Sequence, residues 1–302
     1  MAEQGEDRRV RPETILLATD LDDLERLMPF ALRMAGETGA RLLLLHVLSF
    51  AAEYAVDAAG MPYYDPESVF LSVNDTLESW CRRARKQGVG CEGIVRGGHS
   101  PAREILAAVR QFKADRIILG TRSRSKIGKL LLGSVAEQVL RSIDLPVFTV
   151  GPEAHLATPG NDRKPAVLFA TTLGEGHRAR AALACQIAVH GKERLLLLHV
   201  LPPLDEIEGR LSPSSLDSAV LHELADLAHD TGANCALDIQ SKVAHGEPAT
   251  EILAEACACD ADLIVLGVAQ HGVVDSIFHD HTIDRVLAHS HCPVLTMPPS
   301  SS

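Results

Sequence analysis

The sequence has few aromatic residues: Phe, Trp and Tyr together make up 4% of its 302 residues. Hydrophobic residues nevertheless reach 46%, so the core must be built from Leu, Val, Ile and Ala. Such an aliphatic core favours buried parallel strands covered by helices rich in Ala and Leu. The chain also lacks an apolar run of the ~20 residues needed to cross a bilayer, so we expect no membrane partner.

Cysteine pairs and an excess of positive charge are also missing. The seven cysteines are odd in number and include no C-x-x-C pair. With no signal peptide, they indicate a reducing, cytoplasmic location. Twenty-nine Lys and Arg stand against 40 Asp and Glu, a formal charge of −11. Because such a surface repels a duplex, we expect no nucleic-acid partner, although a local basic patch could still hold a small anion.

An internal repeat is the strongest organisational feature of the chain. Four blocks recur in the same order at nearly constant offset, which chance does not explain. They are Arg41–Leu48 with Arg194–Leu201, Ser100–Leu106 with Glu247–Leu253, Ala114–Gly120 with Ala261–Gly267, and Leu145–Val147 with Cys292–Val294.

The repeat and the length predict two domains, since one core rarely exceeds about 250–300 residues. We expect the first at 10–150, a Pro- and Gly-containing linker at 151–164, and the second at 165–298. Strand-length apolar runs alternate with helix-length amphipathic stretches in each copy. This order predicts an α/β fold: two tandem doubly wound domains, each a five-stranded parallel sheet flanked by helices. The expected strands of the first copy are Thr14–Thr19, Arg41–Leu48, Gly90–Val95, Arg116–Leu119 and Val147–Val150, and its helices Leu24–Thr38, Ser68–Gln87, Pro101–Phe112 and Ser134–Ile143.

The segment from Gly120 to Val135 carries the most chemical information. It begins where the fourth strand ends, and ligands of such sheets bind beyond the carboxyl ends of the strands. Gly133 and Ser134 begin the next helix, where free N–H groups and the helix dipole favour an anion. The loop also places four cations in an otherwise acidic protein: Arg122, Arg124, Lys126 and Lys129.

These residues resemble the nucleotide loop of the universal stress protein family, which has the form G-x2-G-x9-G-S/T after a hydrophobic strand. The loop here reads Gly120-x2-Ser123-x9-Gly133-Ser134, so the spacing is kept and one Gly is replaced by Ser. The resemblance covers nearly the whole chain in two copies. It implies an adenine nucleotide alpha hydrolase-like, Rossmann-like fold in each.

The resemblance further implies that the first domain binds ATP, ADP or AMP, with Mg2+ as a candidate companion cation. The acid at the end of the first strand would contact adenine and ribose, and the Gly-rich loop would hold ribose and phosphates. Ser123 either strains a backbone that needs positive φ or donates its hydroxyl to a phosphate. The implied binding residues are Ala18, Thr19, Asp20, Val47, Leu119, Gly120, Arg122, Ser123, Gly133, Ser134 and Val135.

The second copy departs further from this pattern. Its loop has Asp280 and His281 where Gly and Ser would be, and an Asp at that position repels phosphate. Thr172 stands where the first copy has Asp20. We therefore interpret it as a degenerate site kept for its fold and its interface. The resemblance also suggests pairing of the two domains within one chain, and a homodimer remains open.

Weaker patterns have ordinary explanations. The His-rich segment 271–292 offers His279 and His281 as candidate metal ligands, but no H-x3-H pair occurs, and a solvated helix rim is favoured. His46 and His199 occupy equivalent strand positions, as expected of core or domain-contact residues.

No nucleophile elbow, P-loop lysine or evident general base for the γ-phosphate is found. We therefore expect a stress-response protein linked to nucleotide binding, with at most weak hydrolysis. A slow ATPase using the same loop and a scaffold that binds no nucleotide are the alternatives.

Overall fold

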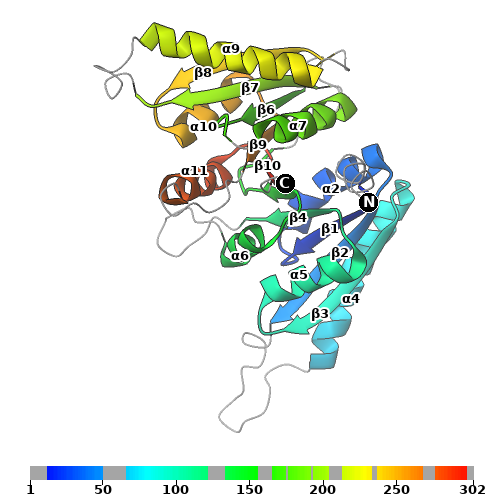
Figure 1. Ribbon diagram of the computed structural model, residues 1–302. Coiled ribbons are helices and arrows are strands. Elements are labelled where there is room, and N and C mark those ends of the chain that lie inside the picture. Colours follow the sequence, from blue (N-terminus) through cyan, green and yellow to red (C-terminus); the bar gives the residue numbers. More distant parts are fainter. Residues whose placement is uncertain are drawn as a thin grey trace. The chain divides into compact units, whose positions relative to one another are not determined.

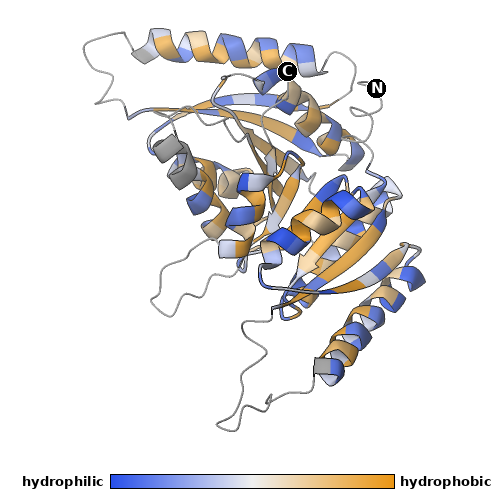
Figure 2. Ribbon diagram, turned by 60° about the horizontal axis from the view of Figure 1, so that its bottom comes forward, coloured by the Kyte–Doolittle hydropathy of each residue, from blue (hydrophilic) through white to orange (hydrophobic). Residues whose placement is uncertain are grey.

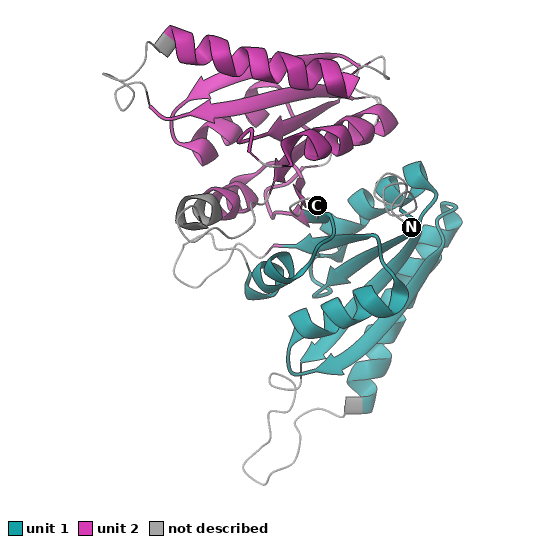
Figure 3. Ribbon diagram, viewed as in Figure 1, with its two compact units in different colours: residues 1–120, 133–148 teal, residues 121–132, 149–302 magenta. Residues whose placement is uncertain are grey.

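The computed structural model describes residues 12–49, 66–121, 133–155, 165–174, 176–191, 193–203, 213–232, 237–267 and 276–297. The chain divides into two compact units, 1–120 with 133–148 and 121–132 with 149–302 (Figure 3).

The first half forms a sheet with the strand order β3-β2-β1-β4-β5 (Figure 1). Strand β1 pairs in parallel with both β2 and β4, and β2 pairs in parallel with β3. The elements are β1 (Thr14–Thr19), α2 (Leu24–Thr38), β2 (Arg41–Ser49), α4 (Pro66–Lys86), β3 (Cys91–Gly98), α5 (Pro101–Phe112), β4 (Arg116–Gly120), α6 (Ser134–Ser142) and β5 (Val147–Val150).

The second half repeats this topology with the strand order β8-β7-β6-β9-β10. Its central strand β6 pairs in parallel with β7 and β9, as β1 does with β2 and β4. The predicted α/β class, with two tandem doubly wound domains, is therefore confirmed. The elements are β6 (Ala166–Ala170), α7 (His177–Gly191), β7 (Arg194–Leu201), α9 (Pro213–Gly232), β8 (Ile239–His245), α10 (Pro248–Ala258), β9 (Leu263–Gly267), α11 (Ser276–His289) and β10 (Val294–Met297).

Aliphatic strands form the core of each unit, as the shortage of aromatics predicts. Every residue of β1 is buried, and so are Leu42 to Leu45 of β2. In Figure 2 the strands are predominantly hydrophobic, whereas α4 alternates between polar and apolar residues along its length. Arg83 of α4 forms an ion pair with Glu25 of α2 at 3.9 Å. Helices α5 and α6 pack together.

Local sequence signals explain the element ends. Pro101 occupies the first turn of α5, and the Ser100 side chain accepts a hydrogen bond from the Arg103 amide, as expected of a helix cap.

Strand β3 runs three residues beyond its predicted end at Val95, since pairing with β2 continues through Ser49 and Gly98. Sequence periodicity could not reveal this extension, because it depends on the neighbouring strand.

The boundary between the units falls inside β5. Residues from Thr149 onward join the second unit, where the Thr149 hydroxyl donates to the Val294 carbonyl at 3.1 Å. The His155 amide donates to the His291 carbonyl at 2.7 Å. Thr149 and His155 therefore have hydrogen-bond partners within the second unit, and the linker at 151–164 stays a prediction.

Candidate functional site

The candidate site lies at the carboxyl edge of the first sheet. Strand register places Thr19 opposite His46 and Ala18 opposite Leu119. The residues that follow these positions are Asp20, Val47 and Gly120. Three of the predicted site residues therefore lie level with one another on or directly after three adjacent strands, towards the carboxyl edge of the sheet where ligands of doubly wound sheets bind.

A tight turn follows β1 and positions the acidic side chains. The Thr19 hydroxyl accepts a hydrogen bond from the Leu21 amide at 2.9 Å and donates to Asp23 Oδ1 at 2.5 Å. Asp20 Oδ1 in turn accepts from the Asp23 amide at 3.2 Å. Leu21 has φ of 77°, a left-handed conformation that costs a non-glycine residue about 1–2 kcal/mol. The turn fixes the direction in which Asp20 leaves the strand.

Asp23 is a site residue that the sequence interpretation missed. Its carboxylate lies against the α-carbon of Gly120, so a Cβ added there would overlap Asp23 and approach the Arg26 guanidinium. The pKa of Asp23 is raised to about 6: burial and, less strongly, the nearby Asp20 raise it, while the Thr19 hydrogen bond and Arg26 lower it. Any side chain at position 120 would therefore have to displace this carboxylate. The four-residue spacing from Thr19 was the available signal.

His46 links β2 to the end of β1. Its Nδ1 lies 2.9 Å from the Thr19 carbonyl oxygen, and the residue is half-buried. In the second unit, His199 Nδ1 lies 2.8 Å from the Thr171 carbonyl oxygen. The same contact in both halves agrees with the prediction of a structural histidine.

The amino end of α6 stands at the other end of the predicted loop. Gly133 is the N-cap residue with φ of −63°, and among the described residues no side-chain hydrogen bond caps this end. A Cβ added at Gly133 would meet nothing within 4 Å. Ser134 is exposed and Val135 half-buried, so the first-turn N–H groups are available for an anion.

The remaining predicted residues fall into two groups. Ala18 and Leu119 are 8% and 3% exposed, so their side chains belong to the core. Arg122, Ser123, Arg124, Lys126 and Lys129 lie outside the described residues. The structure consequently gives the two ends of the Gly-rich loop.

The equivalent edge of the second unit has a different charge pattern. The turn recurs, with the Leu173 amide donating to Thr171 Oγ1 at 3.1 Å. Gly267, the counterpart of Gly120, faces the Arg180 side chain.

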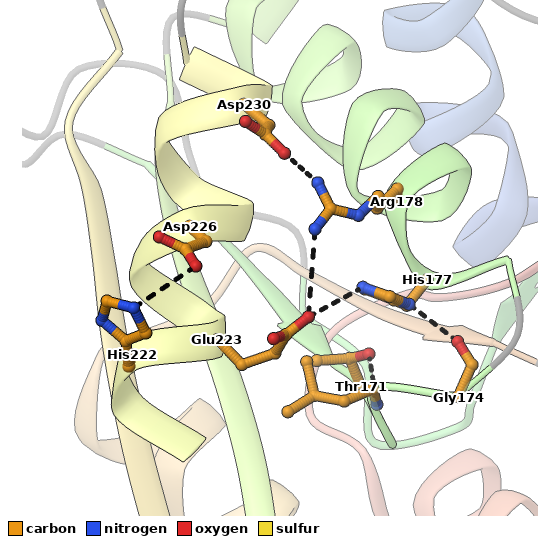
Figure 4. Close-up of polar contacts among 9 residues, drawn as sticks. Thr171, Gly174, His177, Arg178, His222, Glu223, Asp226 and Asp230 are labelled. Atoms are coloured by element: carbon orange, nitrogen blue, oxygen red, sulfur yellow. Dashed lines mark hydrogen bonds and ion pairs between the residues drawn. The ribbon is translucent and has the colours of Figure 1, made fainter. Parts of the chain in front are cut away.

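Beside this turn, His177 and Arg178 of α7 face acidic side chains of α9 (Figure 4). His177 Nε2 lies 3.7 Å from Glu223 Oε1, and Arg178 pairs with Asp230. The second unit thus has Thr172 at the position of Asp20, and the nearby Arg178 already has an acidic partner in Asp230.

Metal binding and membrane insertion can also be judged from the described residues. Among the residues for which the structure gives positions, no three His, Cys, Asp or Glu side chains gather where they could bind a metal ion. The side chains of His279 and His281 are not among them. Within the same described ranges, no helix combines the length and apolar character that a membrane span requires.

Comparison with known proteins identifies the family. The model of the universal stress protein family matches residues 12–151 and 166–298, and the chain belongs to this family. A Thermus aquaticus protein described as "Universal stress protein in QAH/OAS sulfhydrylase 3'region" is 33% identical over 144 residues, covering 46% of this chain and 98% of the relative. Universal stress protein YxiE of Bacillus subtilis is 28% identical, covering 45% of this chain and 97% of its own.

A solved structure matches both halves together. The crystal structure of a universal stress protein from Archaeoglobus fulgidus superposes with a TM-score of 0.72, at 21% identity, covering 97% of this chain and 98% of that one. This likeness supports the fold of the whole chain.

Proposed function

We propose that the first domain binds one adenine nucleotide, ATP, ADP or AMP, at the carboxyl edge formed by β1, β2 and β4. The observation that carries this proposal is the alignment of Asp20, Val47 and Gly120 on adjacent strands. The amino end of α6, which begins after Gly133, follows the same loop in the chain. The second domain keeps the turn but has Thr172 in place of the acid.

The roles of the residues follow from their chemistry. The Asp20 carboxylate can accept hydrogen bonds from ribose hydroxyls or the adenine amino group, and Val47 offers backbone groups to the base. The first-turn N–H groups of α6 hold phosphate oxygens, with the loop cations balancing their charge. Asp23 opposes phosphate near Gly120, so binding requires its protonation or displacement.

The biochemical role is regulatory in this proposal. Nucleotide that binds only one conformation of the first domain shifts the population toward that conformation and stabilises it. The domain limits of 10–150 and 165–298 belong to the same proposal, with the second domain serving as a structural partner. This role in the cytosol needs no catalytic residue.

Titration calorimetry on the full chain tests the proposal. We expect saturable ATP binding with a stoichiometry of one, and a loss of at least tenfold in affinity for Asp20→Ala. The matched control is Thr172→Ala, the same position in the second copy, which should leave affinity unchanged. Mass spectrometry of ligand released from fresh protein would identify the bound nucleotide. Absence of binding in the wild-type protein, or loss only in Thr172→Ala, contradicts the proposal.

A further inference from the structure

Two buried cysteines of the first unit touch each other. Cys81 lies on α4, and Cys91 is the first residue of β3. The Cys91 thiol donates to Cys81 Sγ with 2.8 Å between the sulfurs. Cys81 is completely buried and Cys91 is 9% exposed, and both are free thiols. The nucleotide site uses neither of them.

The packing of α4 on β3 brings the two thiols together. Leu77 and Cys81 are four residues apart and share one face of the helix, while Cys91 and Gly93 share one face of the strand. A Cβ added at Gly93 would lie 2.9 Å from the Leu77 Cβ, so Gly93 permits close approach of helix and strand one turn before Cys81. Arg85 Nε, one turn after Cys81 on α4, donates to the Cys91 carbonyl at 3.0 Å and ties the helix to the start of the strand.

We propose that Cys81 and Cys91 form a reversible disulfide when the protein meets a hydroperoxide. A disulfide requires an S–S distance of about 2.05 Å, so the sulfurs need to approach by less than one ångström from their present contact. The close packing at Gly93 and the Arg85 hydrogen bond hold the backbone while they do so.

The hydrogen bond between the thiols prepares them for this reaction. It lowers the pKa of Cys81, which accepts the bond, despite the opposing effect of burial. It raises the pKa of Cys91, the donor, in the same direction as burial. Cys81 is therefore the thiol that ionises first, and thiolate is the nucleophilic form.

The reaction balances with hydroperoxide as the only oxidant. The Cys81 thiolate attacks the terminal oxygen and breaks the O–O bond, which gives Cys81 sulfenic acid and an alkoxide that takes up the proton Cys81 had lost. Cys91 sulfur then attacks Cys81 Sγ, and hydroxide leaves with the Cys91 proton as water. Two thiols and one hydroperoxide become one disulfide, one alcohol and one water.

The two thiols occur in the first repeat, and they lie towards the amino ends of its strands, opposite the carboxyl edge proposed for the nucleotide. In the sheet register Cys91 pairs with Leu42, and the corresponding partner of Leu195 in the second unit is Ile239. Cys91 begins its strand, whereas the proposed nucleotide site lies where the parallel strands end. The disulfide therefore does not depend on nucleotide binding.

The test is mild oxidation of the reduced full-length protein with hydrogen peroxide. We expect an intact mass lower by two hydrogen atoms. Tryptic mapping should give a cross-linked pair of peptides, one ending at Arg82 and the other spanning 87–96. Dithiothreitol should reverse both changes. The thermal midpoint of the first domain should rise by about 5 °C on oxidation, because the cross-link restricts the unfolded chain.

Two variants separate this bond from other thiol chemistry. Cys91→Ser should lose the cross-linked peptides and the rise in midpoint, while Cys257→Ser, which alters an exposed thiol, should keep both. A cross-link that joins any other pair of cysteines overturns the proposal. So does oxidation of Cys81 to higher acids without a cross-link. Reduced Cys91→Ser with a native circular dichroism spectrum shows that the variant is folded.

Discussion

Asp23→Asn should stabilise the first domain at neutral and alkaline pH. The carboxylate is largely enclosed between Thr19, Asp20 and Gly120, and burial raises its pKa from 3.8 to about 6. Asparagine keeps an Oδ1 that accepts the Thr19 hydrogen bond but carries no charge. The change therefore removes the cost of burying a charge while keeping the turn after β1.

The sign and size of the effect follow from linkage. A carboxyl group whose pKa is higher in the folded state contributes stability that is complete below its unfolded pKa of 3.8 and is lost as pH rises through about 6. One pKa unit corresponds to about 1.4 kcal/mol, which gives about 3 kcal/mol for this shift and about 2 kcal/mol once solvent screening is included. The variant should exceed the wild type by that amount at pH 8 and by little at pH 4.

The single tryptophan makes this measurable. Trp80 lies on α4 of the first unit, with the Arg83 guanidinium 4.6 Å from its ring centroid, so urea unfolding followed by Trp fluorescence reports the first domain. Asp22→Asn, which neutralises the exposed neighbouring acid, should shift the curve far less. An Asp23→Asn variant that gains nothing at pH 8, or gains equally at pH 4 and pH 8, would refute the reasoning.

Three further predictions concern the loop and its ends. Gly133→Asp should abolish nucleotide binding while the circular dichroism spectrum stays native, because the added side chain meets no atom within 4 Å but its charge repels phosphate. Gly133→Asn is the uncharged control. Unchanged affinity in Gly133→Asp would mean that the phosphates bind elsewhere. Ser123→Gly should tighten ATP several-fold in calorimetry by allowing a closer backbone approach, whereas a tenfold loss would make the Ser123 hydroxyl a ligand contact. Gly120→Ala should lower the free energy of unfolding of the first domain by about 1–3 kcal/mol, because the new methyl group overlaps Asp23. Adding Asp23→Ala to the same chain should restore most of that loss. Urea unfolding followed by Trp80 fluorescence measures both changes.

The repeat and the strand runs allowed most of the fold to be predicted. Repeated blocks such as Arg41–Leu48 and Arg194–Leu201 showed which residues of the two halves correspond. The alternation of strands and helices then predicted a doubly wound sheet in each half. Strand ends were less predictable, since β3 continues to Gly98 only because β2 continues to Ser49.

The site was only partly accessible from sequence. Motif spacing led to Asp20 and Gly120, because these positions follow strands directly. Asp23 was missed, because its place against Gly120 depends on a turn whose left-handed Leu21 no motif describes. The contact between Cys81 and Cys91 likewise depends on how α4 packs on β3. Such features arise from three-dimensional packing, and local patterns do not encode them.

The turn after the first strand of each half has an evolutionary consequence. Leu21 and Leu173 both keep positive φ, at 77° and 57°, and both amides bond to the preceding threonine hydroxyl. The first turn continues with Asp20, whereas the second copy has Thr172 at that position. The two copies within one chain can therefore be compared with each other. A strained feature that both copies retain is needed for folding. A feature that differs between them is not needed for folding and was free to be selected for another purpose. By this criterion, the turn is inherited architecture, and Asp20, where the second copy has Thr172, is the part of the first copy that selection could adapt.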